Sequence, residues 1–396
     1  MTTWPNELMT YAKFWNSVRT CSELIRTPFI IITNLESQFG ITEGALSWLK
    51  SYLKDRKQRI EVDGVSSREF DLPFGVPQGS CLGPLLFTLY ASGLVREIQL
   101  NFPEVQCHTY ADDTQLYISF SPNIANEDHC VSVLEECISH IYKWLLSRNL
   151  LLNDKKTEFL ICGTSQQVTK LHTESIKVVS AQIFPSECAR NLGVWFDSQL
   201  TFERHISNVC KSSFYTLFNI RHIRKYLTRQ STEKIIHAFV TSRLDYCNSL
   251  LLGLPDYQIR KLQRVQNACA RLVCDSPRFS HCSPLLRELH WLPVKQRIIF
   301  KILLITYRAI HDMAPLYIQE LVTLKSSSNL RYRLRSSEDR LLLRVPSSKS
   351  KITLGDRAFM FAAPKLWNAL PISIRQAQTL DHFKSGLKTH LFNADQ

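Results

Sequence analysis

Apolar and polar residues alternate on both sides of one short acidic turn. Thr109 precedes the turn, and an apolar run from Leu116 to Phe120 follows it. β-Branched and aromatic residues around two turn residues are typical of a tight β-hairpin. The turn itself contains Asp112 and Asp113. The pattern therefore predicts a hairpin that carries two adjacent carboxylates at its tip.

Two carboxylates this close repel each other unless a cation lies beside them. Mg²⁺ binds through a few carboxylates together with substrate phosphates, so this tip suits one half of a two-metal phosphoryl-transfer site. Aspartate is also common in turns, because its side chain bonds the local backbone. The acidic pair alone is therefore compatible with both interpretations, a metal site and an ordinary turn.

A glycine-rich segment, residues 74–87, lies about thirty positions upstream of the acidic turn. Gly75 and Gly79 permit positive φ or the close approach of another backbone, and Pro77 stiffens the loop between them. Gly83 and the proline after it suit the first turn of a helix, because proline fits the first helical position. Apolar residues then recur on one face, which predicts a helix directly after the glycine turn. They are Leu82, Leu85, Leu86, Leu89 and Tyr90.

Together, the glycine-rich segment and the acidic hairpin resemble a polymerase palm, and in detail the reverse transcriptases of non-LTR (LINE-type) retrotransposons. The likeness runs from about Ile30 to Asp275 and is weaker in the tail. It implies that Asp112 and Asp113 are catalytic residues that bind Mg²⁺ or Mn²⁺. It also implies a template- and nucleotide-binding set that consists of Gly75, Pro77, Gln78, Gly79, Ser80, Tyr110 and Lys156.

The resemblance continues beyond the palm. Residues 190–197 are similar to the strand pair called the primer grip, with Leu192 and Gly193 as its central residues. Residues 203–275 have apolar side chains at helical spacing and correspond to the thumb, which clamps the template–primer duplex in the family. A generic basic helical domain is the alternative, and the position after the primer grip favours the thumb. The candidate nucleic-acid contacts of the thumb are Arg221, Arg224, Lys225 and Arg229.

A third carboxylate of the family, on the strand before the glycine turn, is not recognisable. Counting back from the helix expected at residues 30–36 places Val18 and Leu24 at the two family aspartates, and no aspartate precedes Asp55. Without that strand, its neighbours would expose unpaired backbone groups, so we expect a gap in the palm sheet. Loss of a bridging carboxylate lowers the rate by on the order of three to five decades. We therefore expect an N-terminally truncated, inactive reverse transcriptase without fingers.

These segments define an α+β fold with four parts: an incomplete palm made of an antiparallel sheet and helices, a helical thumb, and unrelated sequence at one end and a helical extension at the other. The predicted boundaries are residues 1–28 for the unrelated segment, 29–202 for the partial palm, 203–275 for the thumb, and 276–396 for the mainly helical extension, with a serine-rich basic linker near 326–350.

Composition agrees with a nucleic-acid partner. The formal net charge is +13, and hydrophobic residues make up 44% of the chain, which is typical of a globular protein and excludes a disordered one. Twelve cysteines without a Cys-x-x-Cys pair, and no secretory signal, indicate a reducing intracellular compartment. The family implies the nucleus. No apolar stretch reaches membrane-spanning length, and the spacing of Cys269, Cys274, His281 and Cys282 fits no standard zinc site.

Three functions remain open. The first is RNA-directed DNA polymerisation, for which the family implies an RNA template, a DNA primer and deoxynucleoside triphosphates. The second is a non-catalytic remnant that still binds nucleic acid. The third is a decayed mobile-element reading frame with no cellular role.

Overall fold

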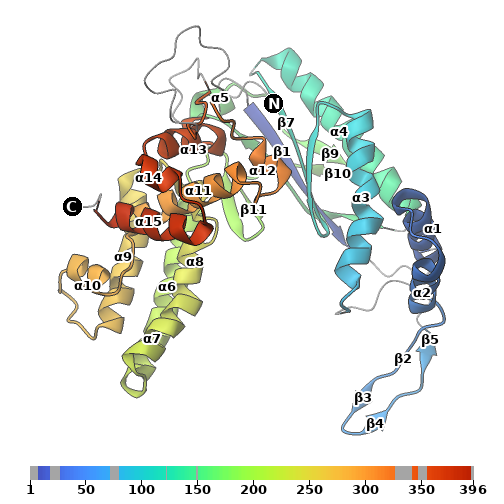
Figure 1. Ribbon diagram of the computed structural model, residues 1–396. Coiled ribbons are helices and arrows are strands. Elements are labelled where there is room, and N and C mark those ends of the chain that lie inside the picture. Colours follow the sequence, from blue (N-terminus) through green and yellow to red (C-terminus); the bar gives the residue numbers. More distant parts are fainter. Residues whose placement is uncertain are drawn as a thin grey trace. The chain divides into compact units, whose positions relative to one another are not determined.

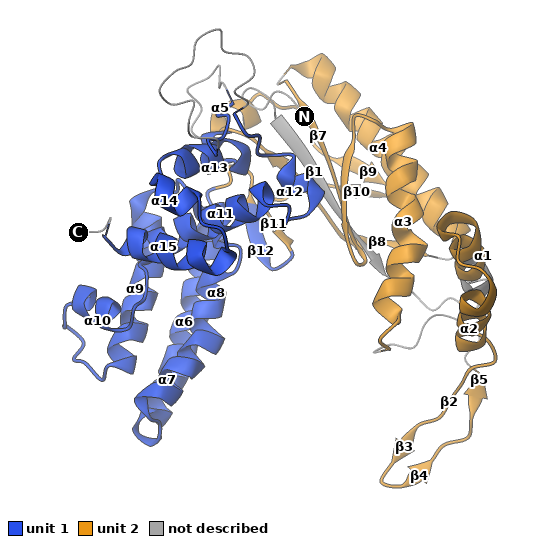
Figure 2. Cartoon of the chain, in the orientation of Figure 1, with its two compact units in different colours: residues 1–6, 192–196, 201–396 blue, residues 7–191, 197–200 orange. Residues whose placement is uncertain are grey.

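The computed structural model describes residues 8–17, 27–71, 80–121, 123–148, 150–325, 341–346 and 355–393. The chain divides into two compact units, shown in separate colours in Figure 2. The sheet unit comprises residues 7–191 and 197–200, and the helical unit comprises residues 1–6, 192–196 and 201–396.

The sheet unit is built on a four-stranded antiparallel sheet with the order β6-β7-β1-β8 (Figure 1). Strand β1 is distant in sequence from the strands on either side of it. The strands are β1 (Leu8–Ser17), β6 (Gln106–Tyr110), β7 (Asp113–Phe120) and β8 (Leu151–Cys162).

The gap that we expected in this sheet is not present. β1 pairs with β7 along one edge, from Leu8 opposite Phe120 to Trp15 opposite Asp113. It pairs with β8 along its other edge. The segment that looked unrelated to the family thus supplies a central strand, and the backbone groups of β7 and β8 that face it are paired.

Helices α3 (Gly83–Asn101) and α4 (Ile124–Ser147) belong to the same unit. Alternate residues of β7, such as Leu116 and Ile118, are buried in one core with Ile138 of α4, because successive side chains of a strand point to opposite faces. The side chain of Asn123 accepts a hydrogen bond from the backbone N–H of Asn126 at 2.9 Å and so caps α4.

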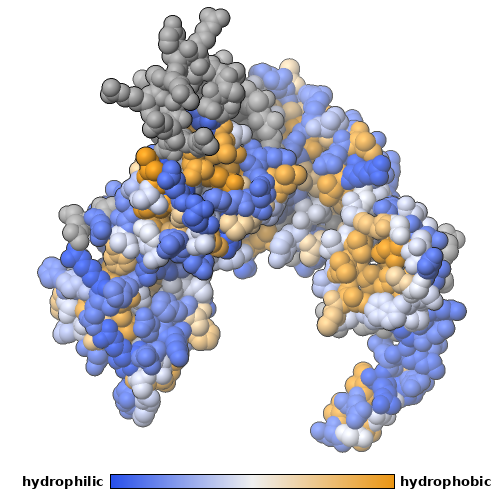
Figure 3. All heavy atoms as spheres, viewed as in Figure 1, coloured by the Kyte–Doolittle hydropathy of each residue, from blue (hydrophilic) through white to orange (hydrophobic). Residues whose placement is uncertain are grey.

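The smaller elements of the sheet unit include a two-stranded ribbon after α2. In the ribbon β2 pairs with β5 and β3 pairs with β4, both antiparallel. Ile60, Val62 and Val65 at its tip are 63–73% exposed, and Figure 3 shows this apolar tip. The elements are α1 (Thr27–Phe39), α2 (Glu43–Leu53), β2 (Lys57–Gln58), β3 (Glu61–Val62), β4 (Val65–Ser66), β5 (Phe70–Asp71), α5 (Ser165–Val168), β9 (Ile176–Val178), β10 (Ala181–Ile183) and β11 (Cys188–Asn191).

The helical unit has a core of stacked aromatic rings. Tyr307 stacks on Phe383 with 4.3 Å between ring centroids, and Trp367 lies 5.7 Å from Phe383. Its elements, with β12 at the boundary of the units, are β12 (Val194–Asp197), α6 (Glu203–Ile223), η1 (Arg224–Tyr226), α7 (Arg229–Ile236), η2 (His237–Thr241), α8 (Ser242–Asp245), η3 (Asn248–Leu251), α9 (Asp256–Val273), α10 (Cys282–Glu288), α11 (Val294–Ile310), α12 (Leu316–Gln319), η6 (Gly355–Arg357), α13 (Phe359–Asn368), α14 (Ile372–Arg375) and α15 (Leu380–Asn393).

The serine-rich linker expected near residues 326–350 contains a packed piece. Leu343 is only 2% exposed, and its backbone N–H and C=O both bond the side chain of Asn368 at 2.9 Å. The indole N–H of Trp367 donates to the carbonyl of Leu341 at 2.7 Å. Residues 341–346 are therefore held against α13, while the rest of the predicted linker lies outside the described residues.

Candidate functional site

The predicted acidic hairpin is confirmed. Tyr110 of β6 pairs with Asp113 of β7, so Ala111 and Asp112 form the two-residue connection. Ala111 has a left-handed backbone with φ of 52°, which a non-glycine residue rarely adopts. Tyr110 is 65% exposed beside this turn. The backbone therefore holds the two aspartates at the end of the sheet.

The two carboxylates occupy different environments. Asp112 is exposed in the turn, whereas Asp113 is the first residue of β7 and is only 6% exposed. By strand alternation Asp113 shares a sheet face with Gln115, and Leu116 lies on the opposite face, which packs on α4. The acidic pair thus lies at one end of the sheet, with Asp113 on the face away from the helices.

The strand next to Asp113 supplies no carboxylate. Trp15 of β1 is directly opposite Asp113 on one side and opposite Asn153 of β8 on the other. The whole of β1, LMTYAKFWNS, contains neither aspartate nor glutamate. Among the residues that the structure describes, no group of three or more His, Cys, Asp or Glu side chains is placed to hold a metal ion.

Lys156 lies on the same sheet as the acidic hairpin. The pairing of β1 with β8 shifts between Lys13, which is opposite Glu158, and Trp15, so that residues 154–157 form an irregular stretch opposite a single residue of β1. Lys156 is exposed within it. Because β1 alone separates β7 from β8, two strand spacings, about 10 Å, lie between the two strands.

The glycine-rich segment is described only at its end. The hydroxyl oxygen of Ser80 accepts a hydrogen bond from the backbone N–H of Gly83 at 3.1 Å, at the start of α3. This confirms the helix predicted after the glycine turn. The other predicted residues of the loop, Gly75, Pro77, Gln78 and Gly79, lie outside the described residues.

The strand pair predicted as the primer grip forms the hairpin of β11 and β12. Leu192 and Gly193 both have positive φ, 44° and 86°, as a two-residue type I′ turn requires. Within the sheet unit, the amide of Gln115 donates to the side-chain oxygen of Asn191 at 2.7 Å. This bond joins β11 to the sheet face that carries Asp113, and no local pattern in the sequence indicates it.

Within the helical unit, Tyr246 holds the turn of the same hairpin. Its hydroxyl donates to the carbonyl oxygen of Leu192 at 2.6 Å. A Cβ atom at position 193 would lie 3.5 Å from the Tyr246 ring. At position 193, glycine is therefore favoured by the positive φ of the backbone and not by lack of space for a small side chain.

The four predicted thumb cations divide into two groups. Arg224 donates to the carbonyls of Leu272 and Val273 and so satisfies the C-terminal end of α9. Arg229 forms an ion pair with Glu288 at 2.5 Å, whereas Arg221 and Lys225 are exposed. The nucleic-acid role of all four remains a prediction, and Arg224 also has a structural role.

An aromatic and basic surface on α6 was not apparent from the sequence pattern. Phe214, Tyr215 and Phe218 are 45%, 70% and 58% exposed, although apolar rings usually turn toward a core. Lys211 and His222 are exposed on the same side, because residues three, four and seven apart share a helix face. We call this set of five residues the α6 face.

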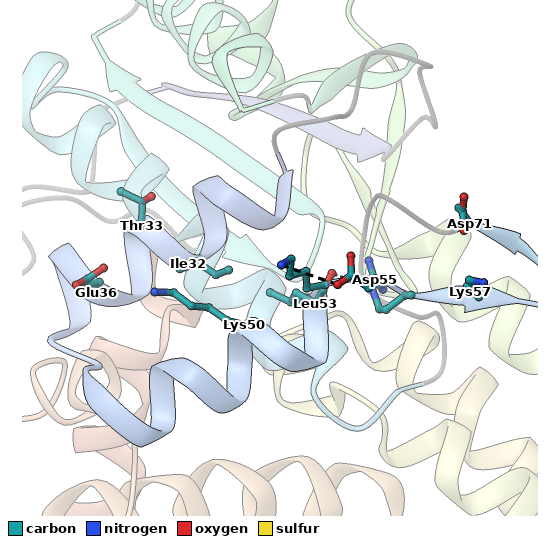
Figure 4. Close-up of a pocket in the computed structure, with 10 residues that line it drawn as sticks. Ile32, Thr33, Glu36, Lys50, Leu53, Asp55, Lys57 and Asp71 are labelled. Atoms are coloured by element: carbon teal, nitrogen blue, oxygen red, sulfur yellow. Dashed lines mark hydrogen bonds and ion pairs between the residues drawn. The ribbon is translucent and has the colours of Figure 1, made fainter.

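A groove of about 800 Å³ lies beside α1, α2 and the base of the ribbon (Figure 4). Burial lowers the pKa of the Arg56 guanidinium there. Four cations and three carboxylates line the groove, so its charges nearly balance and favour no ligand class. They are Lys50, Lys54, Arg56, Lys57, Glu36, Asp55 and Asp71. None of the described helices is long and apolar enough to cross a membrane.

The sheet unit is thus a mixed α+β structure with an antiparallel sheet, helices on one face and an acidic hairpin at one end. Residues 31–196 match the family described as reverse transcriptase (RNA-dependent DNA polymerase). This region belongs to that family, in the group of jockey- and X-element-type non-LTR retrotransposons.

Three relatives come from Drosophila melanogaster. The probable RNA-directed DNA polymerase from transposon BS is 26% identical over 259 residues, 63% of this chain and 28% of the relative. The probable RNA-directed DNA polymerase from transposon X-element is 24% identical over 245 residues, which are 61% of this chain and 26% of the relative. The RNA-directed DNA polymerase from mobile element jockey is 28% identical over 165 residues, which are 41% of this chain and 17% of the relative. The chain thus spans less than a third of each relative.

A solved structure of telomerase from Candida albicans with a TWJ fragment of telomeric RNA covers 75% of this chain and 47% of that one, at 14% identity. Its TM-score of 0.26 is too low to support a structural argument.

We predict that Arg224→Gln lowers the free energy of unfolding by about 2 kcal/mol, because bonds from a charged donor to the carbonyls of α9 are lost. Urea denaturation of the purified chain measures this change. Arg221→Gln is the matched control and should change stability by less than about 0.5 kcal/mol, since Arg221 is exposed. Equal stability of the two variants would contradict the assignment.

Proposed function

We propose that this chain binds an RNA–DNA template–primer duplex and, on its own, does not extend the primer. One observation carries the proposal: the strand paired beside Asp113 has no carboxylate in any of its ten residues. The reverse transcriptase family of residues 31–196 supports nucleic acid as the partner.

The family implies a divalent metal, and the acidic hairpin fits it in part. Asp112 and Asp113 offer the oxygen ligands that Mg²⁺ and Mn²⁺ prefer, and such ions are commonly bound by one or two carboxylates plus substrate phosphates. A bound ion would polarise a phosphoryl oxygen and stabilise developing charge. The two aspartates suffice to hold one ion, but two-metal catalysis needs a further ligand.

Other residues of the sheet unit would act on the substrate. The exposed ammonium of Lys156, two strand spacings from β7, is suited to offset the charge of nucleotide phosphates. In the same proposal, Tyr110 beside the acidic turn contacts the nucleotide. RNA-directed DNA synthesis is the second candidate function, and it is favoured by Asp113 and Lys156 occurring on one sheet.

The helical unit supplies the proposed duplex-binding surface. The α6 face combines three exposed rings with Lys211 and His222, and it contains no acidic residue. Exposed rings can pack on the sugars of a duplex, whose bases are already stacked on one another, while cations neutralise phosphates. Arg221 in the last turn of α6 and Lys225 in η1, directly after it, continue the positive charge. We therefore place the duplex contact on the α6 face rather than on Arg224.

We predict that the double substitution Tyr215→Ala and Phe218→Ala weakens duplex binding by roughly 10- to 100-fold, because each ring loses apolar contact with the duplex worth about 0.7–1.4 kcal/mol. Fluorescence anisotropy with a labelled RNA–DNA duplex at fixed salt measures the loss. Both rings are exposed, so the fold should be retained.

Phe279→Ala is the matched control, because Phe279 is an aromatic residue that is 90% exposed, lies beside Arg278 and belongs to the loop between α9 and α10 rather than to α6. It should leave the affinity unchanged. Equal losses for the control and the double variant would remove the α6 face as the binding surface.

We predict that the purified chain with Mg²⁺ or Mn²⁺ extends a DNA primer on an RNA template no faster than its Asp112→Asn, Asp113→Asn variant. Both proteins should still bind the duplex, with an affinity that falls steeply as salt rises. Extension by the parent chain that disappears in the double variant would establish the second candidate function instead.

We predict that Trp15→Asp raises the affinity for Mn²⁺ on the order of tenfold, because added ligand charge strengthens a site for a hard cation. Position 15 is paired with Asp113 in the register of β1 and β7, and paired positions of neighbouring strands are close to each other. Electron paramagnetic resonance of free Mn²⁺ measures the affinity. Trp15→Asn removes the charge, and Phe14→Asp moves it to the position paired with Thr114; an equal gain in either control would contradict the register.

A further inference from the structure

The sheet contains a position for a strand between β7 and β8. These two strands are not neighbours, since β1 lies between them. Both are antiparallel to β1 and therefore run parallel to each other. Parallel strands use a slanted hydrogen-bond pattern that differs from the antiparallel one. The facing edges of β7 and β8 are thus arranged for one antiparallel strand between them.

Other elements join β7 to β8 without β1. Below the sheet, buried residues of both strands, such as Ile118 and Phe159, share one core with Ile138 of α4. Packing on α4 therefore holds β7 and β8 together in addition to their pairing with β1.

On the other face, β11 bridges the same two strands. Asn191 accepts from Gln115 of β7 at 2.7 Å, and the backbone N–H of the preceding residue, Arg190, donates to Glu158 of β8 at 3.2 Å. Gln115 and Glu158 are the two residues paired with Lys13 of β1. Consecutive residues of β11 thus link the two sides of the position at a single row of the sheet.

We propose that this position is a strand-acceptor site and that Leu8–Ser17 is a separable strand bound in it. β1 forms eight residue pairs with β7 and eight with β8, so main-chain pairing on both edges supplies the recognition. The acceptor strands lie inside the family match of residues 31–196, whereas the bound strand lies outside it. The inference does not depend on the proposed duplex binding.

The first test is disulfide trapping. Met9 is directly opposite Cys162, and such antiparallel residues have Cβ atoms about 4.5–5.5 Å apart on one face. Mild oxidation of Met9→Cys in the full chain should therefore give a 9–162 disulfide, identified by mass spectrometry of peptides. Thr10→Cys is the matched control, because position 10 is paired with Ile161 rather than with Cys162.

The second test separates the strand from its acceptor. A protease site placed between Ser17 and Thr27 of the full chain allows the strand to be cut after folding. The cut strand should stay bound and should exchange with an excess of a labelled peptide of residues 8–17. A peptide with Ala12→Pro should bind roughly 100-fold more weakly, because proline in a central strand removes a hydrogen bond and clashes.

Three outcomes would overturn the inference. Equal cross-linking of the Met9→Cys and Thr10→Cys variants would contradict the register. Cross-links found only between two copies of the chain would show that the strand does not occupy its own acceptor. Equal binding of the parent and proline peptides, or no binding of either, would show that the position does not recognise an extended strand. The cross-linking tests use the intact chain, and the peptide test uses cut protein that stays folded.

Discussion

The pairing of β1 between β7 and β8 is the constraint on which the rest of the sheet unit depends. An unfilled position would leave two rows of backbone donors and acceptors without partners, which is costly wherever water cannot reach them. The same pairing places Asp113, position 15 and Asn153 in one row. It therefore keeps the acidic hairpin aligned with the stretch that carries Lys156. The alignment of the acidic hairpin thus depends on a strand whose own residues offer no carboxylate.

The helical unit shows why net charge is a poor guide to where nucleic acid binds. A chain of formal charge +13 is attracted to phosphates in general, but individual cations can have structural partners. Arg224 closes the end of α9 and Arg229 pairs with Glu288. The three exposed aromatic rings beside basic residues on α6 are a stronger indication of a nucleic-acid-binding surface than the net charge. These rings are not buried in an apolar core. Their solvent-exposed area is therefore available to a partner.

Local patterns allowed the acidic hairpin, the start of α3 at Gly83 and the helical character after residue 203 to be predicted from the sequence, because turn chemistry and side-chain periodicity act over a few residues. Long-range pairing did not follow. β1 pairs with β7 about 100 residues away and with β8 about 140 residues away, and no property of LMTYAKFWNS selects these two strands as its neighbours. The Gln115–Asn191 bond and the capping by Arg224 escaped prediction for the same reason. Leu85, expected on the buried face of α3, is instead 55% exposed.

The ribbon that follows α2 bears on how the protein behaves in concentrated solution. Val62 pairs with Val65 at its tip, and both are more than 60% exposed on a sheet of only two strands. Exposed β-branched residues on short unpaired edges favour sheet extension from one molecule to the next. Glu61, Asp63 and Arg68 around the tip act against such association, because charged neighbours are repelled or hydrated. Colloidal stability of the chain should therefore depend on ionic strength through a segment remote from the acidic hairpin in sequence.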